Sequence, residues 1–224
     1  MYRKTWLEVN LDAIYDNVRD IKKICNKKFI AVLKADAYGC GDNQVAKACL
    51  DAGADMIAVS SLDEAVILRN KGYDGELFIL GVVDPSEVSV LIRYDIATAV
   101  VSPLWAQQVC HENCRGLKVH LACDTGMNRI GMKDICTLHQ CADMLKEHGC
   151  LVEGIFTHFC NTDKADRSYT DHQFEKFREA VTSFSEPFRW VHCDNSDATI
   201  FFKDDISNAC RVGISLYGIS PYKD

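Results

Sequence analysis

The segment Phe29-Ile-Ala-Val-Leu33, followed by Lys34-Ala-Asp-Ala-Tyr38-Gly39-Cys40-Gly41, decides the fold of this chain. Its first half is a short, continuous apolar run, which is typical of a strand buried on both faces of a sheet. Its second half places a lysine at the end of that strand and opens a glycine-containing loop. We expect Lys34 to be accessible but poorly hydrated, which favours the neutral amine as a nucleophile. Such a lysine suits a Schiff base with pyridoxal phosphate; an ordinary lysine at a strand rim is the alternative.

The size and composition of the chain fit one globular domain with a large core. It has 224 residues, of which 48% are hydrophobic and 25% are charged. The net charge of -7 argues against a nucleic-acid backbone as partner. No apolar run approaches the length of a membrane span, and the first residues lack the apolar stretch of a signal peptide. We therefore expect a cytoplasmic protein with no nucleic-acid or membrane partner.

The cysteine spacing argues against a disulfide framework or a metal site. The chain has 12 cysteines, but none forms a C-x-x-C pair, and several, such as Cys49 and Cys210, lie within apolar runs. We expect reduced, structural thiols and no bound metal. The best remaining zinc candidate is a group of four residues: His158, Cys160, His192 and Cys193.

Short strand-like runs alternate with helical patterns along the whole chain. The runs are rich in Val, Ile, Leu and Phe and lie near residues 29–34, 56–60, 77–80, 96–101, 118–123, 152–157, 190–192 and 209–213. Helices are predicted between them, at residues 42–52, 62–71, 86–94, 104–114, 133–148, 171–185 and 196–202. A further helix begins near residues 11–12.

This alternation predicts a (β/α)8 TIM barrel, with a doubly wound open sheet as the alternative. Neither G-x-G-x-x-G nor G-x-x-x-x-G-K-[ST] is present, which weakens a nucleotide-binding interpretation. The barrel is predicted to be incomplete, because too few residues follow the eighth strand for a final helix. Residues 5–10 alternate like an extra strand but have no partner in the chain. We therefore divide the chain into an orphan strand, 1–10, and a barrel domain, 11–224.

The ends of the predicted strands carry a mixed set of polar residues. In a TIM barrel these ends share one rim, where active sites form. The residues at the rim are Lys34 with Tyr38, Ser60, Ser61, Leu80, Gly81, 124–129, His158, Asn195, Ser196 and 211–214. Ser196 could donate its hydroxyl to a phosphate, and Gly213 would let the backbone approach that phosphate closely. Alternatively, Ser196 only caps its helix and Gly213 only packs.

Several ordered motifs resemble one enzyme family. They are the opening segment 6–14, the segment 34–41, Asp124-Thr-Gly-Met-Asn-Arg-Ile-Gly131, Gly154-Ile-Phe-Thr-His-Phe159, His192-Cys-Asp-Asn-Ser196 and Arg211-Val-Gly-Ile-Ser-Leu-Tyr-Gly218. Together they resemble the N-terminal barrel domain of bacterial alanine racemases, which are fold-type III pyridoxal-phosphate enzymes. The resemblance covers essentially the whole chain.

The resemblance implies a role for each matching residue. Lys34 would bind the cofactor covalently and act as the base on one face of the substrate Cα. Arg211 would face the pyridine nitrogen with His158 hydrogen-bonded behind it, and Arg129 would touch the cofactor's phenolic oxygen and the substrate carboxylate. The remaining cofactor-binding residues would be Tyr38, Leu80, Asn195, Ser196, Gly213 and Ile214. Because a guanidinium only donates hydrogen bonds, Arg211 would keep the pyridine nitrogen unprotonated and discourage side reactions such as transamination.

Three departures from the family pattern concern the chemistry. Ala122 stands where many members have a carbamylated lysine that orients the arginine matching Arg129, and Cys40 replaces a common histidine. We also expect the family's C-terminal β-domain to be absent from this chain. In the family that domain supplies a catalytic tyrosine to the partner subunit and would pair with the orphan strand. Racemisation by two bases needs one base on each face of the carbanion, and only Lys34 is matched here.

The resemblance therefore implies a homodimeric alanine racemase that supplies D-alanine for peptidoglycan, with this chain as its N-terminal domain. We expect this fragment to be inactive or weakly active. The alternatives are a serine racemase of the same family, and a single-domain pyridoxal-phosphate-binding homeostasis protein without racemase activity.

Overall fold

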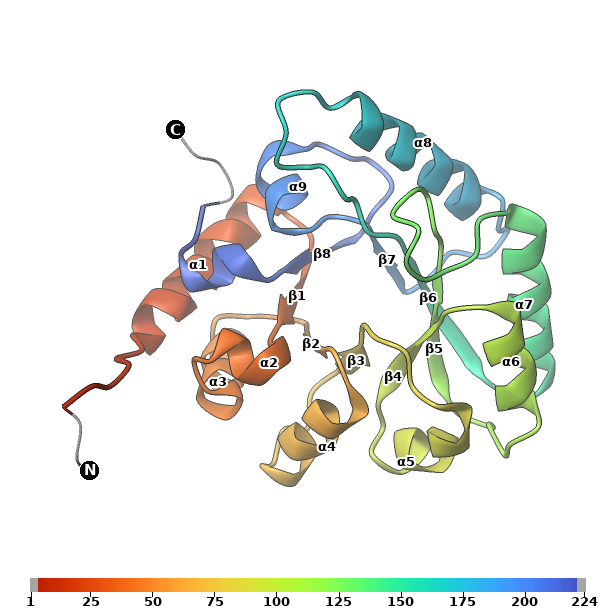
Figure 1. Ribbon diagram of the computed structural model, residues 1–224, viewed down its shortest axis with the longest axis horizontal. Helices are drawn as coiled ribbons and strands as arrows, with labels where there is room; N and C mark the ends of the chain where they lie inside the picture. Colours follow the sequence, from red (N-terminus) through yellow and green to blue (C-terminus); the bar gives the residue numbers. More distant parts are fainter. Residues whose placement is uncertain (1–3, 221–224) are drawn as a thin grey trace.

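Eight parallel strands close into a barrel in this computed structural model, which describes residues 4–220 (Figure 1). The strands are β1 (Lys28–Val32), β2 (Met56–Val59), β3 (Leu77–Ile79), β4 (Ala97–Val100), β5 (Lys118–Ala122), β6 (Leu151–Phe156), β7 (Trp190–His192) and β8 (Ala209–Val212). Each strand pairs with the next, and β1 closes the ring on β8 with Lys28 opposite Ala209 and Ala31 opposite Val212. The predicted TIM barrel is confirmed, because the ring is closed, whereas an open sheet would have two edge strands.

Helices cover the outside of the barrel between the strands (Figure 1). They are α1 (Leu11–Cys25), α3 (Asp42–Asp51), α4 (Leu62–Asn70), α5 (Val88–Arg93), α6 (Pro103–Cys110), α7 (Ile135–Glu147), α8 (Ser168–Thr182) and α9 (Ser196–Phe201), with a 3-10 turn, η1 (Pro85–Glu87), before α5. Local chemistry explains several helix starts: the side chains of Ser61, Ser102 and Asp134 each accept a backbone N–H of the following first turn. The sequence located these helices to within a few residues.

The segment immediately after β1 departs from the sequence prediction. It forms a short turn, α2 (Lys34–Tyr38), in which Ala35, Asp36 and Ala37 have φ values of 54°, 54° and 53°. Left-handed backbone costs an L-residue about 1–2 kcal/mol, so neighbouring contacts must stabilise the turn. Glu64 provides one of them, because its carboxylate accepts the backbone N–H of Ala35 at 2.7 Å.

The ends of the described chain lie on one side of the barrel. Instead of a full helix, a 3-10 turn, η2 (Ile214–Tyr217), follows β8 and packs against α1. The amide of Asn17 on α1 donates to the backbone oxygen of Leu216 at 3.0 Å. Residues 4–10 form no strand and extend away from the barrel (Figure 1), with Trp6 66% exposed. The domain division after residue 10 therefore stays a prediction.

Two apolar layers position the site. An outer layer packs the helices against the barrel, and an inner layer fills its interior with residues such as Met56, Phe78 and Trp190. The interior also contains buried polar side chains, among them Arg211 and His192. All 12 cysteines are free thiols in this structure. No helix between residues 4 and 220 is long and apolar enough to cross a membrane.

Candidate functional site

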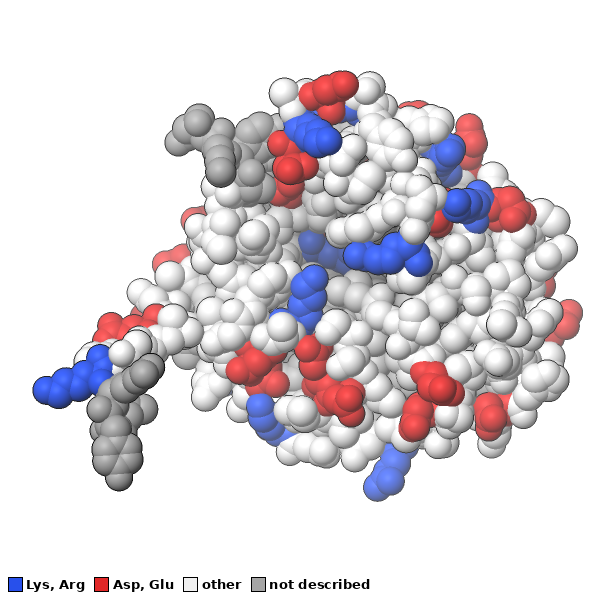
Figure 2. All heavy atoms as spheres, in the orientation of Figure 1, with Lys and Arg blue, Asp and Glu red and all other residues white. Residues whose placement is uncertain are grey.

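A cavity of about 500 Å³ opens at the carboxyl ends of the strands. All ten residues predicted from the sequence line it: Lys34, Tyr38, Leu80, Arg129, His158, Asn195, Ser196, Arg211, Gly213 and Ile214. Figure 2 shows this face hollowed at its centre, with Lys and Arg side chains gathered in and beside the hollow. Parallel strands deliver residues far apart in the sequence to one rim, and the resulting concentration of positive charge suits an anionic ligand.

Lys34 lies directly beyond β1, on the wall of the cavity. Its Nζ atom is 5.7 Å from the centre of the Tyr38 ring, and the residue is exposed. The exposure of the residue argues against the poor hydration expected of its amine. The expectation of an accessible amine beside the cavity is confirmed.

Ser196 and Gly213 form the corner of the cavity between β7 and β8. The Ser196 hydroxyl oxygen accepts the backbone N–H of Gly213 at 3.1 Å and that of Ser215 at 3.4 Å. A hydroxyl that accepts twice still has its own proton to donate. A Cβ at Gly213 would lie 2.7 Å from the Tyr38 hydroxyl oxygen, so only glycine leaves this corner open. The three residues therefore place two hydroxyl groups around a small space suited to a phosphate.

Asn195, not Ser196, caps the short helix α9. The Asn195 side-chain oxygen accepts the backbone N–H of Ala198 at 3.0 Å, and its amide donates to Thr162 at 2.9 Å. The alternative in which Ser196 only caps its helix is therefore wrong. Asn195 lines the cavity but its side chain is already engaged, which gives it a structural task beside any contact with a ligand.

Arg211 rises from β8 into the floor of the cavity and is 4% exposed. Its guanidinium donates to the backbone oxygens of Thr157 and His192, both at 2.7 Å. Nη2 also lies 3.2 Å from Nδ1 of His158, so the predicted contact between Arg211 and His158 is present. Burial lowers the pKa of Arg211 to about 10, which still leaves it protonated at neutral pH. The site thus contains a fixed cation that can only donate.

His158 is neutral in this environment. Burial lowers its pKa to about 3, and the positive charges of Arg211 and Arg129 act in the same direction. Because Arg211 must be the donor in their contact, Nδ1 of His158 is the acceptor and the ring proton belongs on Nε2. His158 therefore helps to orient the guanidinium without adding a charge to the cavity.

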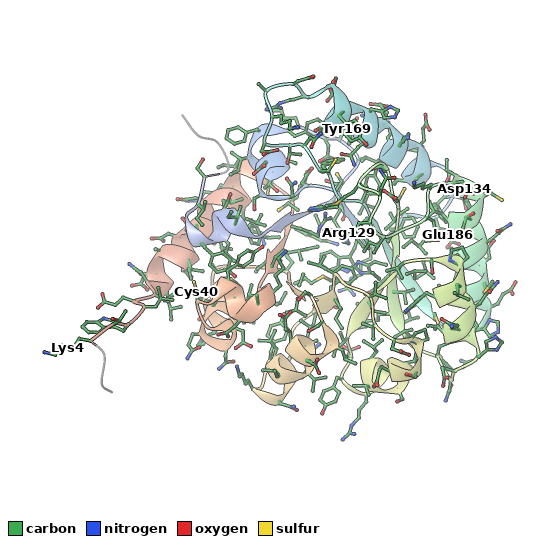
Figure 3. The ribbon with its side chains drawn as sticks, viewed as in Figure 1. Lys4, Cys40, Arg129, Asp134, Tyr169 and Glu186 are labelled. Atoms are coloured by element: carbon green, nitrogen blue, oxygen red, sulfur yellow. The ribbon has the colours of Figure 1, made fainter. Side chains whose placement is uncertain are left out.

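Arg129 is carried over the cavity by the loop between β5 and α7. The Asp124 carboxylate accepts the backbone N–H groups of Gly126 at 3.1 Å and Asn128 at 2.9 Å, which folds the loop onto itself. Figure 3 shows Arg129 over the centre of the barrel and Tyr169 to one side, at the start of α8. The Tyr169 hydroxyl donates to the backbone oxygen of Gly126 at 2.9 Å, so α8 anchors this loop.

Sequence reasoning missed the residue that joins two rim loops, one after β5 and one after β6. Gln173 on α8 is fully buried, and its side-chain oxygen accepts the backbone N–H of Cys160 at 3.1 Å. Its amide donates to Thr125 and to the backbone oxygen of His158, both at 3.3 Å. A glutamine on the apolar face of an amphipathic helix was the available signal, because a buried amide needs partners.

The proposed zinc group does not come together among residues 4–220. The potential ligand atoms that do converge belong to Cys193, Asp194 and Asp204. The Lys27 ammonium occupies that cluster, 2.8 Å from Asp194 and in direct contact with Asp204. Burial, followed by the neighbouring Asp204, raises the pKa of Asp194 to about 7. This arrangement is a buried ion-pair network beneath the Asn195–Ser196 segment.

The fold and cavity define a class: a parallel β/α barrel with an amine, a buried guanidinium and a phosphate-sized corner at the carboxyl rim. The model of one family, "Alanine racemase, N-terminal domain", matches residues 9–221. The chain belongs to that family. It is 40% identical over 227 residues to alanine racemase 1 of Bacillus subtilis, covering 100% of this chain and 58% of that protein. The chain thus spans about three-fifths of the length of the curated relatives it matches.

Solved structures agree with this assignment. Alanine racemase from Bacillus anthracis with bound L-Ala-P superimposes with a TM-score of 0.92 at 37% identity, covering 99% of this chain and 59% of that one. A histidine racemase from Leuconostoc mesenteroides superimposes with a TM-score of 0.87 at 27% identity, covering 93% of this chain and 58% of that one. Proteins named for different amino acids therefore share this barrel, so the barrel alone does not set the substrate side chain.

Proposed function

We propose that this chain binds pyridoxal phosphate and forms the cofactor-carrying barrel of an amino-acid racemase that acts on alanine. The observation that carries the proposal is the arrangement of one cavity, with the Lys34 amine on its wall and the Ser196–Gly213 corner between β7 and β8. Family membership supports it, because the structural relative from Bacillus anthracis is named alanine racemase. Supply of D-alanine for peptidoglycan by the whole protein is part of the same proposal.

The residues present fit this cofactor. The Lys34 amine suits the aldehyde group of pyridoxal phosphate. The hydroxyl groups of Tyr38 and Ser196 suit the phosphate, and the corner stays open because position 213 is glycine. Arg211 provides a donor in the floor of the cavity for the unprotonated pyridine nitrogen.

When bound, pyridoxal phosphate withdraws electrons from the amino acid and makes its Cα–H bond acidic. Lys34 would take that proton on one face of Cα and could return it there. Arg211 would donate a hydrogen bond but no proton to the pyridine nitrogen, which would limit electron withdrawal into the ring and disfavour transamination. Arg129, which lines the cavity, would pair with the substrate carboxylate.

Inversion at Cα needs a second base on the opposite face. We propose that this base comes from the portion of the relatives that this chain does not cover, and from the second subunit of a homodimer. The chain by itself should therefore bind the cofactor weakly and exchange the Cα proton of alanine with solvent faster than it racemises. Exchange with retention is the expected behaviour of a site with one base.

The cofactor site is tested by absorption spectroscopy with added pyridoxal phosphate, borohydride trapping and peptide mapping. We expect a visible band, with the reduced label on Lys34. Lys34→Ala should lose the band, whereas Lys47→Ala, which removes an exposed lysine on α3, should keep it. A label scattered over surface lysines in the wild-type chain would refute the cofactor assignment.

The substrate is tested by NMR detection of Cα deuterium exchange with alanine, serine and histidine. Alanine should exchange fastest. Faster exchange with serine would favour the serine-racemase alternative, for which the small Ala122 side chain beside the cavity leaves extra room. A trapped cofactor on Lys34 without exchange of any amino acid would favour a non-racemising cofactor-binding protein.

A further inference from the structure

A row of polar side chains crosses the otherwise apolar interior of the barrel. It begins at Arg211, whose Nη1 lies 2.8 Å from Nδ1 of His192. The other ring nitrogen of His192, Nε2, lies 2.9 Å from Nδ1 of His120 on β5. Nε2 of His120 faces the Glu153 carboxylate on β6 at 3.7 Å. Both histidines are fully buried, so these contacts are made away from water.

The position of each ring proton in this row of side chains follows from Arg211. Arg211 can only donate, so Nδ1 of His192 accepts and the proton of that ring lies on Nε2. His192 therefore donates to Nδ1 of His120, which leaves the His120 proton on Nε2, pointing at Glu153. The order of donors runs from Arg211 through both rings without conflict, and the last proton points at the carboxylate across 3.7 Å, a distance too long for a hydrogen bond.

The charge states are consistent with this order. Burial lowers the pKa of both histidines, and for His192 the charge of Arg211 lowers it further, so both rings are neutral. Burial opposes ionisation of Glu153, but its contacts with His120 and Arg189 outweigh this and lower its pKa. Two neutral rings thus lie between a buried cation and a carboxylate, and the two aligned hydrogen bonds from Arg211 to His192 and from His192 to His120 strengthen one another.

Local distortions of the barrel bring His120 and Glu153, the last two residues of this row, to face each other. The pairing of β5 with β6 shifts register between Val119 and His120, where Val119 pairs with Val152 but His120 pairs with Gly154. Glu153 is therefore the extra residue of a bulge, which re-aims its side chain. A Cβ at Gly154 would lie 2.5 Å from Cγ of His120, so the ring fits only because this residue is glycine.

Packing holds both rings in place. The His120 ring stacks on Phe78 with centroids 4.4 Å apart, and the His192 ring stacks on Phe156 at 5.1 Å. Within residues 4–220, Nε2 of His120 and the facing Oε1 of Glu153 are buried and have no hydrogen-bond partner. Buried polar atoms without other partners are rare, so the opposition of these two is a specific feature of the interior.

We propose that His120 and Glu153 are positioning residues for Arg211, acting through His192. This inference rests on the proposed function, in which Arg211 faces the pyridine nitrogen of the cofactor. Glu153 fixes the tautomer of His120, His120 fixes that of His192, and His192 presents a lone pair to Arg211. Outside the barrel interior, Glu153 is 3.4 Å from Arg189, which pairs with Glu76 at 2.6 Å, so ionic contacts near the amino-terminal ends of the strands support the carboxylate.

The first test measures the tautomers in the chain without cofactor. Nitrogen-15 NMR should show His192 and His120 neutral, each protonated on Nε2. Glu153→Gln should weaken that preference at His120, and His120→Phe should weaken it at His192. Met56→Leu, a volume-conserving change in the same interior layer, should leave both unchanged. Protonation of either ring on Nδ1 in the wild-type chain would overturn the proposed order of donors.

The second test measures the effect on bound pyridoxal phosphate. His120→Phe and Glu153→Gln should move the midpoint of the pH titration of the visible band by about half a pH unit or more. His120→Asn should move it less than His120→Phe, because its side-chain oxygen can replace Nδ1 as the acceptor for His192. Met56→Leu should not move it.

The outcomes separate this inference from the proposed function. A wild-type chain without a visible band would overturn the proposed function and, with it, the role assigned to His120 and Glu153. A wild-type band with the same midpoint in both Glu153→Gln and His120→Phe would overturn the positioning role alone. Glu153→Gln nearly preserves side-chain volume, so it keeps the test decisive if His120→Phe does not fold.

Discussion

The hydroxyl of Tyr38 and the α-carbon of Gly213 lie so close together that a Cβ at position 213 would approach the hydroxyl oxygen to 2.7 Å. Tyr38 comes from the left-handed turn after β1, and Gly213 follows β8, the strand that closes the barrel on β1. The contact therefore depends on barrel closure, and it borders the corner that we assign to the phosphate.

Gly213→Ala should displace the Tyr38 hydroxyl and weaken the binding of pyridoxal phosphate about tenfold or more, a loss of about 1.4 kcal/mol. The backbone at Gly213 has φ of -111°, so alanine meets no left-handed strain there and the thermal midpoint should change little. Titration of the visible band measures the affinity. Gly75→Ala is the matched control, because its Cβ would meet the Tyr73 hydroxyl at 2.6 Å away from the cavity. Equal losses of affinity in both variants would contradict this assignment.

Lys27→Met should destabilise the fold by about 3–5 kcal/mol, because it leaves two buried acidic side chains, Asp194 and Asp204, without their cation. Their side chains are only 2% and 0% exposed. Urea unfolding measures the change. Lys23→Met, which removes a surface pair with Asp20, should cost less than about 1 kcal/mol. A similar small loss for Lys27→Met would show that the buried cluster does not depend on the ammonium.

Acid should weaken the contribution of His158 to stability. Its pKa is about 3 in the folded chain and near 6.5 when unperturbed, so unfolding takes up a proton between those values. The contribution is therefore complete above pH 6.5 and falls as the pH decreases, by at most about 1.4 kcal/mol per unit. Urea unfolding of wild type and His158→Asn at pH 7 and pH 5 should show a smaller difference at pH 5. A difference that does not change with pH would mean that His158 titrates normally.

Gln173→Leu should cost about 1–3 kcal/mol of stability, because the backbone N–H of Cys160 loses its acceptor inside the protein. It should also increase hydrogen exchange in the loop that carries Arg129, since Thr125 loses the amide of Gln173. Gln140→Leu, on the exposed side of α7, is the control and should change neither. Unchanged exchange in residues 124–131 would show that Gln173 does not hold this loop.

The strands and most helices were predictable because their signals are local. Buried parallel strands such as β2 and β4 appear as short runs of Val, Ile, Ala and Thr, and side-chain caps such as Ser61 mark helix starts. The left-handed turn after Lys34 was not predictable from residues of ordinary helix preference. It is stabilised in part by Glu64, almost thirty residues further along the chain.

The sequence indicated which residues would line the cavity, but not the contacts that hold those residues in place. All ten predicted residues line one cavity, because in a barrel every strand ends at the same rim. Gln173 and His120 were missed, because their partners lie on other elements and only folding shows that a buried amide or imidazole is satisfied there. The exposure of Lys34 also argues against the poor hydration expected of it, since strand position alone does not decide how exposed a side chain is.

The sequence by itself determined the alternation of strands and helices, the family to which the chain belongs, and the residues that gather at the rim. Periodicity, caps and ordered motifs are properties of neighbouring residues, so they can be recognised before folding. Tertiary structure alone decided the exposure of Lys34, the engagement of Asn195 in a helix cap, and the path from Arg211 to Glu153. Those features depend on contacts between strands that are distant in sequence and meet inside a closed barrel. A buried polar atom without a hydrogen bond is costly, and only the folded structure shows which partner it has.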